Sequence, residues 1–189
     1  MTKTALTILA PGFEETEAVT VIDIMRRASI EVTTAALDEI NVPGSHRIPI
    51  QAEILMSDVL HGRFDALVLP GGMRGVQNML QSQALLDLVR RMASEGSVIA
   101  AVCAAPLVLD TLGLLVPNQF TCHPCVYDQL KTPIALTDGI SAPYVIHGNV
   151  VTGRSAGCAM IWALALVQRL TGQVDNLFNG LRLEQNPVF

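Results

Sequence analysis

The chain has few charged and few aromatic residues, and it has no cluster of basic side chains. Of its 189 residues, 15% are charged and 4% are aromatic, and the formal net charge is −5. Binding to nucleic acid or to an anionic membrane requires a basic patch or stripe. The sequence therefore argues against partners of both kinds.

Long apolar runs and an export signal are also missing. The run over residues 4–10 is broken by Pro11 and Gly12 and has neither a basic region ahead of it nor a suitable cleavage site. The longest later run, residues 161–167, is far shorter than the roughly 20 residues that cross a bilayer. We therefore expect an intracellular, cytoplasmic protein.

Cysteine is too scarce for a secreted disulfide scaffold in a chain of this length. We expect all four thiols to be reduced, and they are Cys103, Cys122, Cys125 and Cys158.

Half of the residues are hydrophobic, and most of these are aliphatic or alanine. Without repeats or low-complexity linkers, the chain is expected to form one domain over residues 1–189. Strand-like and helix-like segments alternate, which predicts an α/β fold with a doubly wound, mostly parallel sheet between helices. We expect strands at residues 5–10, 31–36, 66–70 and 97–102, helices at 14–28, 83–93, 158–170 and 174–183, an irregular or hairpin excursion at 41–56, and short strands and loops at 115–151.

The most informative segment places Cys103 directly after the buried strand and just ahead of Pro106, which suits the first turn of a helix. Ala101 and Ala105 supply the small neighbours that a sharp strand-to-helix elbow needs. The start of a helix favours thiolate over thiol, so Cys103 is a candidate nucleophile. The alternative is a free cysteine that serves as a small buried hydrophobe.

Glu17 follows the first strand and lies in helical phase with Val21 and Ile24, which should face the sheet. A buried carboxyl there would stay protonated and donate a hydrogen bond to the elbow thiolate. The pattern alone favours a solvated acidic first turn, in which Glu17 accompanies Glu14 and Glu15.

The third strand is followed by Gly71 and Gly72, where the backbone can approach a ligand and an N–H can bind an oxyanion. The segment has neither the dinucleotide fingerprint nor a Walker loop. An ordinary tight turn over residues 70–75 is the simpler interpretation.

His123 is a candidate general base or proton carrier for a cysteine nucleophile. It lies inside a Cys122-x-x-Cys125 motif, which also permits a redox pair or three zinc ligands. Both alternatives are weaker, because no fourth zinc ligand lies nearby and redox pairs of this kind follow an early strand. The other histidines are expected on the surface: His46, His61 and His147.

Four separated motifs occur in one order along nearly the whole chain: residues 9–18 (LAPGFEETEA), residues 68–72 (VLPGG) with Gly75, Gln77 and Asn78, residues 100–106 (AAVCAAP), and residues 123–124 (HP). In this arrangement the chain resembles the ThiJ/PfpI superfamily, and within it the DJ-one branch. Cys103 is followed by alanine, whereas the peptidase-like branch has histidine there, so the resemblance disfavours a peptidase.

The resemblance implies a flavodoxin-like sandwich, similar to class I glutamine amidotransferases, that is usually a homodimer and needs no cofactor or metal. It makes Cys103 the nucleophile at the elbow, Glu17 the protonated carboxyl beside it and His123 the nearby imidazole. Oxyanion and substrate contacts fall to Gly71, Gly72, Ala104 and Arg154.

Two departures from the family pattern affect the expected pocket. Residues 154–158 read RSAGC where relatives have Arg or Gln followed by Gly-Pro-Gly-Thr, which reshapes the pocket wall. Cys122 replaces a more usual threonine, and it either supplies a resolving thiol near Cys103 or fills space.

The implied function is glyoxalase or deglycase chemistry on methylglyoxal, glyoxal or their early protein adducts. The alternative is an oxidative-stress sensor or redox-regulated chaperone that works through oxidation of Cys103. Thiol-disulfide exchange through Cys122 and Cys125 is a third, weaker alternative.

Overall fold

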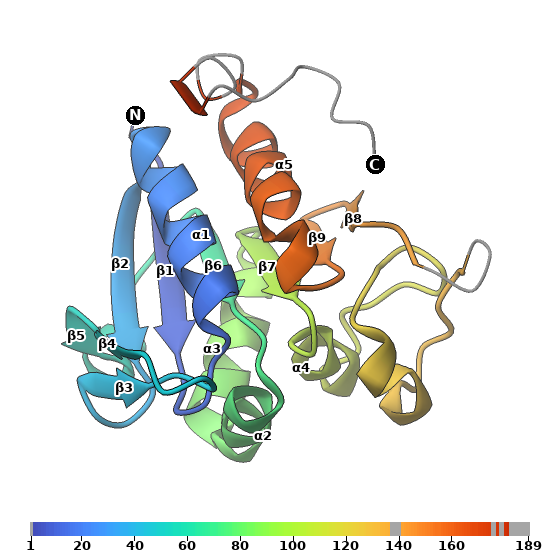
Figure 1. Cartoon of the computed structure of the whole chain (residues 1–189), viewed down its shortest axis with the longest axis horizontal. Helices are drawn as coiled ribbons and strands as arrows, with labels where there is room; N and C mark the ends of the chain where they lie inside the picture. Colours follow the sequence, from blue (N-terminus) through green and yellow to red (C-terminus); the bar gives the residue numbers. More distant parts are fainter. Residues whose placement is uncertain (1, 137–140, 175–176, 178–179, 182–189) are drawn as a thin grey trace.

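A central sheet of seven strands organises the computed structural model, which describes residues 2–136, 141–174, 177 and 180–181 (Figure 1). The strand order is β5-β2-β1-β6-β7-β9-β8, and all neighbours are parallel except β8 and β9. The strands of this sheet are β1 (Thr4–Leu9), β2 (Glu31–Ala36), β5 (Ile54–Leu55), β6 (Ala66–Leu69), β7 (Val98–Val102), β8 (Tyr144–His147) and β9 (Val150–Gly153).

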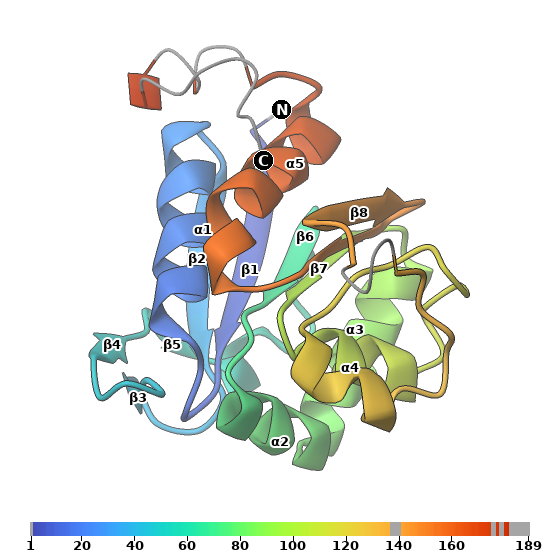
Figure 2. The ribbon, with the colours of Figure 1, turned by 45° about the vertical axis from the view of Figure 1, so that its right-hand side comes forward.

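Helices cover both faces of the sheet (Figure 2). On one face, α1 (Glu15–Arg27) and α5 (Ala159–Thr171) lie side by side and share an apolar cluster with Val68 and Val102. The other face carries α2 (Met73–Gln81), α3 (Gln83–Ser94) and α4 (Pro106–Thr111). Short 3₁₀ turns are η1 (Met56–Val59), η2 (Pro124–Gln129) and η3 (Ala156–Cys158).

The central strands are buried on both sides, which explains their continuous apolar sequences. Every residue of β6 and β7 is buried. Successive side chains alternate between the faces, so Leu67 and Leu69 join the cluster under α2 and α3, whereas Val68 joins the one under α1 and α5.

The structure confirms the predicted α/β fold and the strands and helices on which it rests. The excursion at residues 41–56 contains the expected hairpin, formed by β3 (Asn41–Pro43) and β4 (Pro49–Gln51). The simple turn predicted for residues 70–75 is wrong, because α2 begins at Met73 directly after the glycines. Much of the helix expected at 174–183 lies outside the described residues.

In the described part of the chain, no helix combines the length and apolar character that crossing a bilayer would require. Parallel strands place the segments that follow β1, β6 and β7 at one edge of the sheet. Ligands of such folds bind at this carboxyl edge, so the candidate site is built from those three segments.

Candidate active site

Cys103 occupies the bend between β7 and α4, with a backbone φ of 62°. This left-handed conformation is strained for a residue with a β-carbon and needs support from its surroundings. The end of β9 and the residue ahead of η2 supply it, because the Cys103 N–H donates to the Gly153 carbonyl at 2.9 Å and its carbonyl accepts from the His123 N–H at 2.8 Å. The thiol is held in place and remains partly exposed.

Glu17 is fully buried at the start of α1. Its Oε2 accepts the Gly71 N–H at 2.8 Å, while its Oε1 is buried without a hydrogen-bond partner among the described residues. Burial is the main cause that raises the pKa of this carboxyl to about 7, and the charge of Glu14 raises it further. Glu17 therefore faces the core, as the resemblance implied, and the solvated first turn is wrong for it.

The thiol of Cys103 and the carboxyl of Glu17 lie close enough, on either side of Gly71, that each changes the pKa of the other. Burial raises the pKa of the Cys103 thiol, and the nearby Glu17 carboxylate raises it again by repulsion. The N–H groups of Gly72 and Ala104 lower it by donating to the sulfur. The expectation that the elbow alone favours thiolate is wrong, because burial and the neighbouring carboxylate outweigh these donors.

The two glycines after β6 allow this close approach. A β-carbon on Gly71 would lie 2.6 Å from both the Cys103 β-carbon and Glu17 Oε2. At Gly72, where φ is +89°, a β-carbon would press on the Gly12 carbonyl oxygen and lie 2.7 Å from the Glu14 nitrogen. Any side chain at either position would separate the carboxyl, the thiol and the N–H donors.

Gly72→Ala is therefore expected to destabilise the protein more than a matched Gly148→Ala change, by about 2 kcal/mol, because backbone atoms cannot move aside cheaply. Gly148 also has a positive φ, of +56°, but a β-carbon there meets nothing within 4 Å. Urea unfolding of both variants compares the loss at the crowded position with the cost of a positive φ in open space. Equal losses would show that the approach at Gly72 relaxes easily.

His123 is tied to the elbow through its backbone, but its ring has another partner. Its Nδ1 accepts the Cys125 N–H at 3.1 Å, so a neutral His123 ring carries its proton on Nε2. In this tautomer the ring can donate a proton from Nε2, whereas Nδ1 is not free to act as the base.

The Arg154 side chain points toward neighbours other than the thiol. Its guanidinium donates to the Ser141 carbonyl at 2.6 Å and to the Cys158 sulfur at 3.5 Å. Its backbone follows Gly153, so it borders the elbow. These contacts favour a role in shaping the pocket wall.

The remaining cysteines do not gather around Cys103. Cys122 is fully buried in the apolar cluster under α2 and α3, whereas Cys103 packs against the cluster on the opposite face. This placement favours space filling over a resolving thiol for Cys122. Cys125 is exposed and Cys158 is buried, and both thiols are free.

Within the described residues, one set of three potential metal ligands comes together, and it is not the zinc set considered for Cys122, His123 and Cys125. It consists of Glu14, Glu15 and His46. Glu15 already accepts the His46 N–H at 2.6 Å and the Ser45 hydroxyl at 3.0 Å.

Sequence reasoning missed Glu15, which it placed in a solvated turn. The residue is 95% buried, and its carboxylate clamps the loop between β3 and β4. Burial would raise the pKa of Glu15, but hydrogen bonds from its own backbone and from His46 lower it to about 2. Its loop partners lie about thirty residues away, so no local pattern could have revealed them. The expected exposure of His46, His61 and His147 is confirmed.

Comparison with known proteins shows which family the chain belongs to. The DJ-1/PfpI family model matches residues 3–169. The Drosophila melanogaster protein dj-1beta is 37% identical over 189 residues, covering 98% of this chain and all of that protein. Its crystal structure, at 36% identity, superposes with a TM-score of 0.90 over 97% of this chain and 100% of that one.

The names of two further relatives state an enzymatic activity and an oxidised form, respectively. A Pyrococcus abyssi protein named a deglycase is 28% identical over 165 residues, covering 87% of this chain and 98% of that protein. Toxoplasma gondii DJ-1, solved in an oxidised form, has a TM-score of 0.84 at 31% identity and covers 95% of this chain and 98% of that one. The family match over most of the sequence and the full-length relatives show that this chain belongs to the DJ-1/PfpI family.

Proposed function

We propose that the chain is a cofactor-independent glyoxalase or deglycase that uses Cys103 as its nucleophile. The substrates would be methylglyoxal, glyoxal or their early adducts on proteins. One observation carries the proposal: the buried carboxyl of Glu17, which has a raised pKa and one oxygen unpartnered among the described residues, lies beside the thiol of Cys103. The Cys103 residue is partly exposed, and its backbone is held in a strained left-handed conformation. The Pyrococcus relative named a deglycase supports the same chemistry.

The pair formed by Cys103 and Glu17 would share one proton in its reactive state. Both groups resist ionisation in this buried place, and a charge on either one suppresses ionisation of the other. The pair then loses its first proton near pH 7 and its second well above that. With the remaining proton on Glu17 Oε1, the sulfur carries the charge, and the Gly72 and Ala104 N–H groups hold it.

In the first step, the Cys103 sulfur attacks the aldehyde carbon of methylglyoxal and forms a carbon–sulfur bond. The electron pair of the carbonyl double bond moves to oxygen, which takes the proton from Glu17 and yields a hemithioacetal. The carboxylate formed in this way can then act as a base.

In the second step, Glu17 would remove the hydrogen from the former aldehyde carbon, and the neighbouring ketone carbon would gain a proton. The Nε2–H of His123 is a candidate donor to the developing oxygen. This internal transfer oxidises one carbon and reduces the next, so no external electron acceptor is needed. Water then cleaves the resulting thioester to lactate and regenerates the Cys103 thiol.

Proton NMR of the purified protein with methylglyoxal in D₂O tests this sequence. We expect lactate that carries deuterium at its second carbon, because the proton transferred through Glu17 exchanges with solvent. Lactate formation no faster than in protein-free buffer would contradict the proposal.

Oxidation sensing is a second candidate function, favoured by the donors around the sulfur. The N–H groups of Gly72 and Ala104 are placed to hold oxygens added to Cys103, and the Toxoplasma relative was solved oxidised. Two equivalents of peroxide would convert the thiol to the sulfinic acid and release two waters. A gain of two oxygens at Cys103 in mild peroxide, together with no lactate from methylglyoxal, would favour this function.

We further propose that two copies associate through the face formed by α1 and the β3–β4 hairpin. This face exposes Val19 by 51% and Ile48 by 59%, and a shallow apolar hollow lies between α1 and β4. Val19→Asp is therefore expected to lower the mass measured by light scattering from that of two chains to that of one. The control is Val116→Asp, at an exposed valine elsewhere, and an unchanged mass in the Val19 variant would place the interface on another face.

A further inference from the structure

A cavity opens at the amino edge of the sheet, at the opposite end of β7 from Cys103. It has a volume of about 550 Å³ and is formed where β1, β6, β7 and β9 begin and α5 ends. The five residues of β7 separate this edge from Cys103, a span of roughly 16 Å at about 3.3 Å per residue. Residues that line it include Lys3, Arg63, Asp65, Ser97, Asn149 and Arg169.

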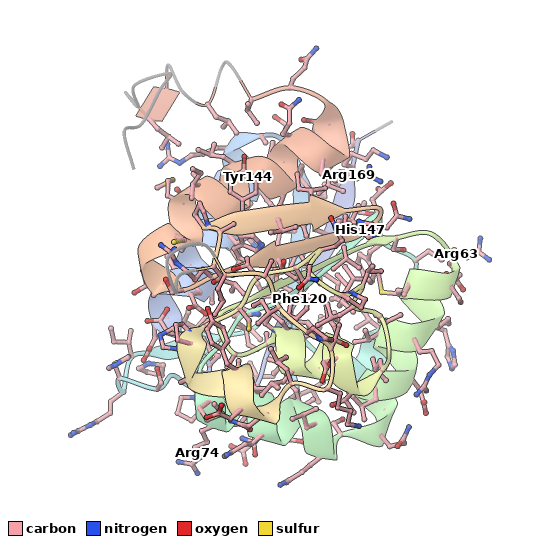
Figure 3. The ribbon with its side chains drawn as sticks, turned by 90° about the vertical axis from the view of Figure 1, so that its right-hand side faces the viewer. Arg63, Arg74, Phe120, Tyr144, His147 and Arg169 are labelled. Carbon is pink, nitrogen blue, oxygen red and sulfur yellow. The ribbon has the colours of Figure 1, made fainter. Side chains whose placement is uncertain are left out.

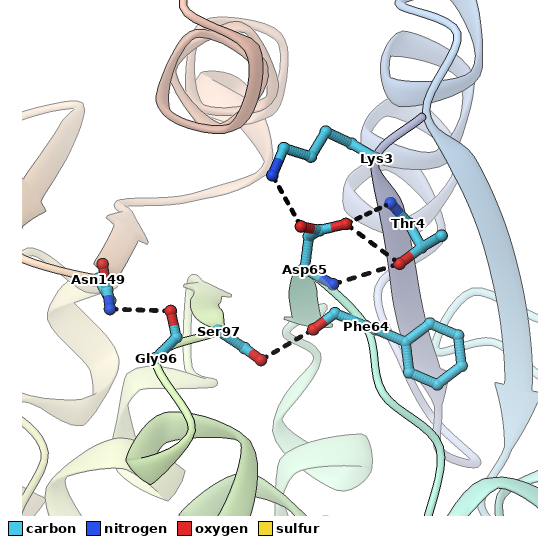
Figure 4. A network of polar contacts seen from close by, with 7 residues as sticks. All are labelled: Lys3, Thr4, Phe64, Asp65, Gly96, Ser97 and Asn149. Atoms are coloured by element: carbon cyan, nitrogen blue, oxygen red, sulfur yellow. Dashed lines mark hydrogen bonds and ion pairs between the residues drawn. The ribbon is translucent and has the colours of Figure 1, made fainter. Parts of the chain in front are cut away.

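Hydrogen bonds fix the floor of this cavity (Figure 4). Asp65 accepts the Lys3 ammonium at 2.7 Å and the Thr4 N–H at 2.9 Å, and the ammonium is the main cause that lowers the pKa of this carboxyl. The Ser97 hydroxyl donates to the Phe64 carbonyl at 2.8 Å. These bonds join the starts of β1, β6 and β7, so the shape of the cavity is set before any ligand binds.

Both carboxylates of the cavity have a cationic partner. Asp65 pairs with Lys3, and Glu95 pairs with Arg91 at 2.9 Å. The charge of Lys3 is therefore balanced by Asp65, and two guanidinium groups of the cavity remain without a carboxylate partner among the described residues.

The two remaining guanidinium groups, those of Arg63 and Arg169, have no carboxylate partner in the described part of the chain. Arg169 donates to the Gly148 carbonyl and to the side-chain oxygen of Asn149, which are uncharged acceptors. Arg63 is exposed and makes no hydrogen bond or ion pair within the described residues. Both lie on the same side of the molecule, away from Arg74, which follows the glycine pair of the active site (Figure 3).

We propose that this cavity binds a small organic phosphate. Its volume lies within the range of roughly 300–1,000 Å³ found for small-molecule sites. The two remaining guanidinium groups line it from separate segments, and their combined charge matches the double negative charge of a phosphate monoester. Guanidinium groups also bind phosphate oxygens with strong charge-assisted hydrogen bonds. The site lies apart from Cys103, so the binding does not depend on the proposed enzymatic activity.

The test is a titration of the ¹⁵N-labelled full chain with glycerol phosphate at constant ionic strength. We expect saturable shifts of the Gly96 and Asn149 amide signals, with little change at Gly71 and Gly72. Arg63→Ala and Arg169→Gln should each weaken binding by about tenfold or more, because each removes a charge-assisted contact. Glutamine at 169 can still donate to the Gly148 carbonyl, which protects the fold.

The matched control is Arg90→Ala, which removes an exposed arginine on α3 that pairs with Asp87. This variant should bind as tightly as the unaltered chain. Equal weakening in the Arg63 and Arg90 variants would reduce the effect to general charge and overturn the proposal. Shifts confined to the Cys103 edge, or no saturable shift at all, would overturn it too.

Discussion

Replacing Cys103 with serine is expected to reduce lactate formation from methylglyoxal by about a thousandfold or more. A hydroxyl is a far weaker nucleophile than a thiolate at neutral pH, and nucleophile losses in other enzymes are at least this large. Serine has nearly the same shape, and the backbone at position 103 keeps its left-handed conformation, so the fold should survive. Rates of lactate formation measure the expected loss of activity, and the thermal unfolding midpoints of both proteins check that the fold survives.

Cys125→Ser is the matched control, because it removes an exposed thiol near His123 and leaves the elbow intact. It should retain full activity. Lactate formation that survives in the Cys103 variant would remove that residue as the nucleophile. A loss of activity that follows Cys125 would instead support thiol-disulfide chemistry.

Glu17→Gln is expected to change activity and stability in opposite directions. Activity should fall by about a hundredfold or more, because glutamine can neither give a proton to the substrate oxygen nor take one from carbon. The unfolding free energy should rise at alkaline pH, because the variant no longer buries a carboxylate. An amide can still accept the Gly71 N–H, so the local structure has a replacement for its main contact.

The pH range of this stabilisation follows from the raised pKa of Glu17. Its ordinary value is 4.5 and its folded value is about 7, so the folded protein holds the proton more tightly than the unfolded chain. Below the ordinary value both states are protonated, and the carboxyl costs no stability. Between these values the cost grows as pH rises, and above about 7 it reaches at most about 3 kcal/mol.

Urea unfolding at acidic and alkaline pH measures this effect, with Glu31→Gln as the control at an exposed glutamate. The Glu17 variant should gain stability only on the alkaline side, and the control should gain on neither. A Glu17 variant that is less stable at alkaline pH would show that the folded protein prefers the carboxylate.

The order of residues within short segments predicted the strands, bends and helices that neighbouring residues determine. The apolar run ahead of Cys103 and Pro106 just after it specify a strand, a bend and a helix. The glycine pair at residues 71 and 72 predicted a turn, and α2 was therefore not predicted. Its apolar side chains at Met73, Val76 and Met79 nevertheless recur at helical spacing. The helix begins so close to the glycine pair that the turn and the helix start overlap.

The candidate site depended on contacts between distant segments. Glu17 lies in a first turn where acidic residues are usually solvated, and its burial depends on Gly71, 54 residues away. The pKa of Cys103 likewise depends on that carboxylate across the sheet edge. Family resemblance supplied the pairing that the pattern around each residue left open.

The most direct test is the pH dependence of Cys103 alkylation by iodoacetamide, followed on its peptide by mass spectrometry. If Cys103 and Glu17 share a proton, the rate should rise with pH around a midpoint near 7, where the pair loses its first proton. The midpoint should move in Glu17→Gln. A midpoint at or above the ordinary thiol value of 9.0 in both proteins would contradict proton sharing, as would an unreactive Cys103 beside a reactive Cys125.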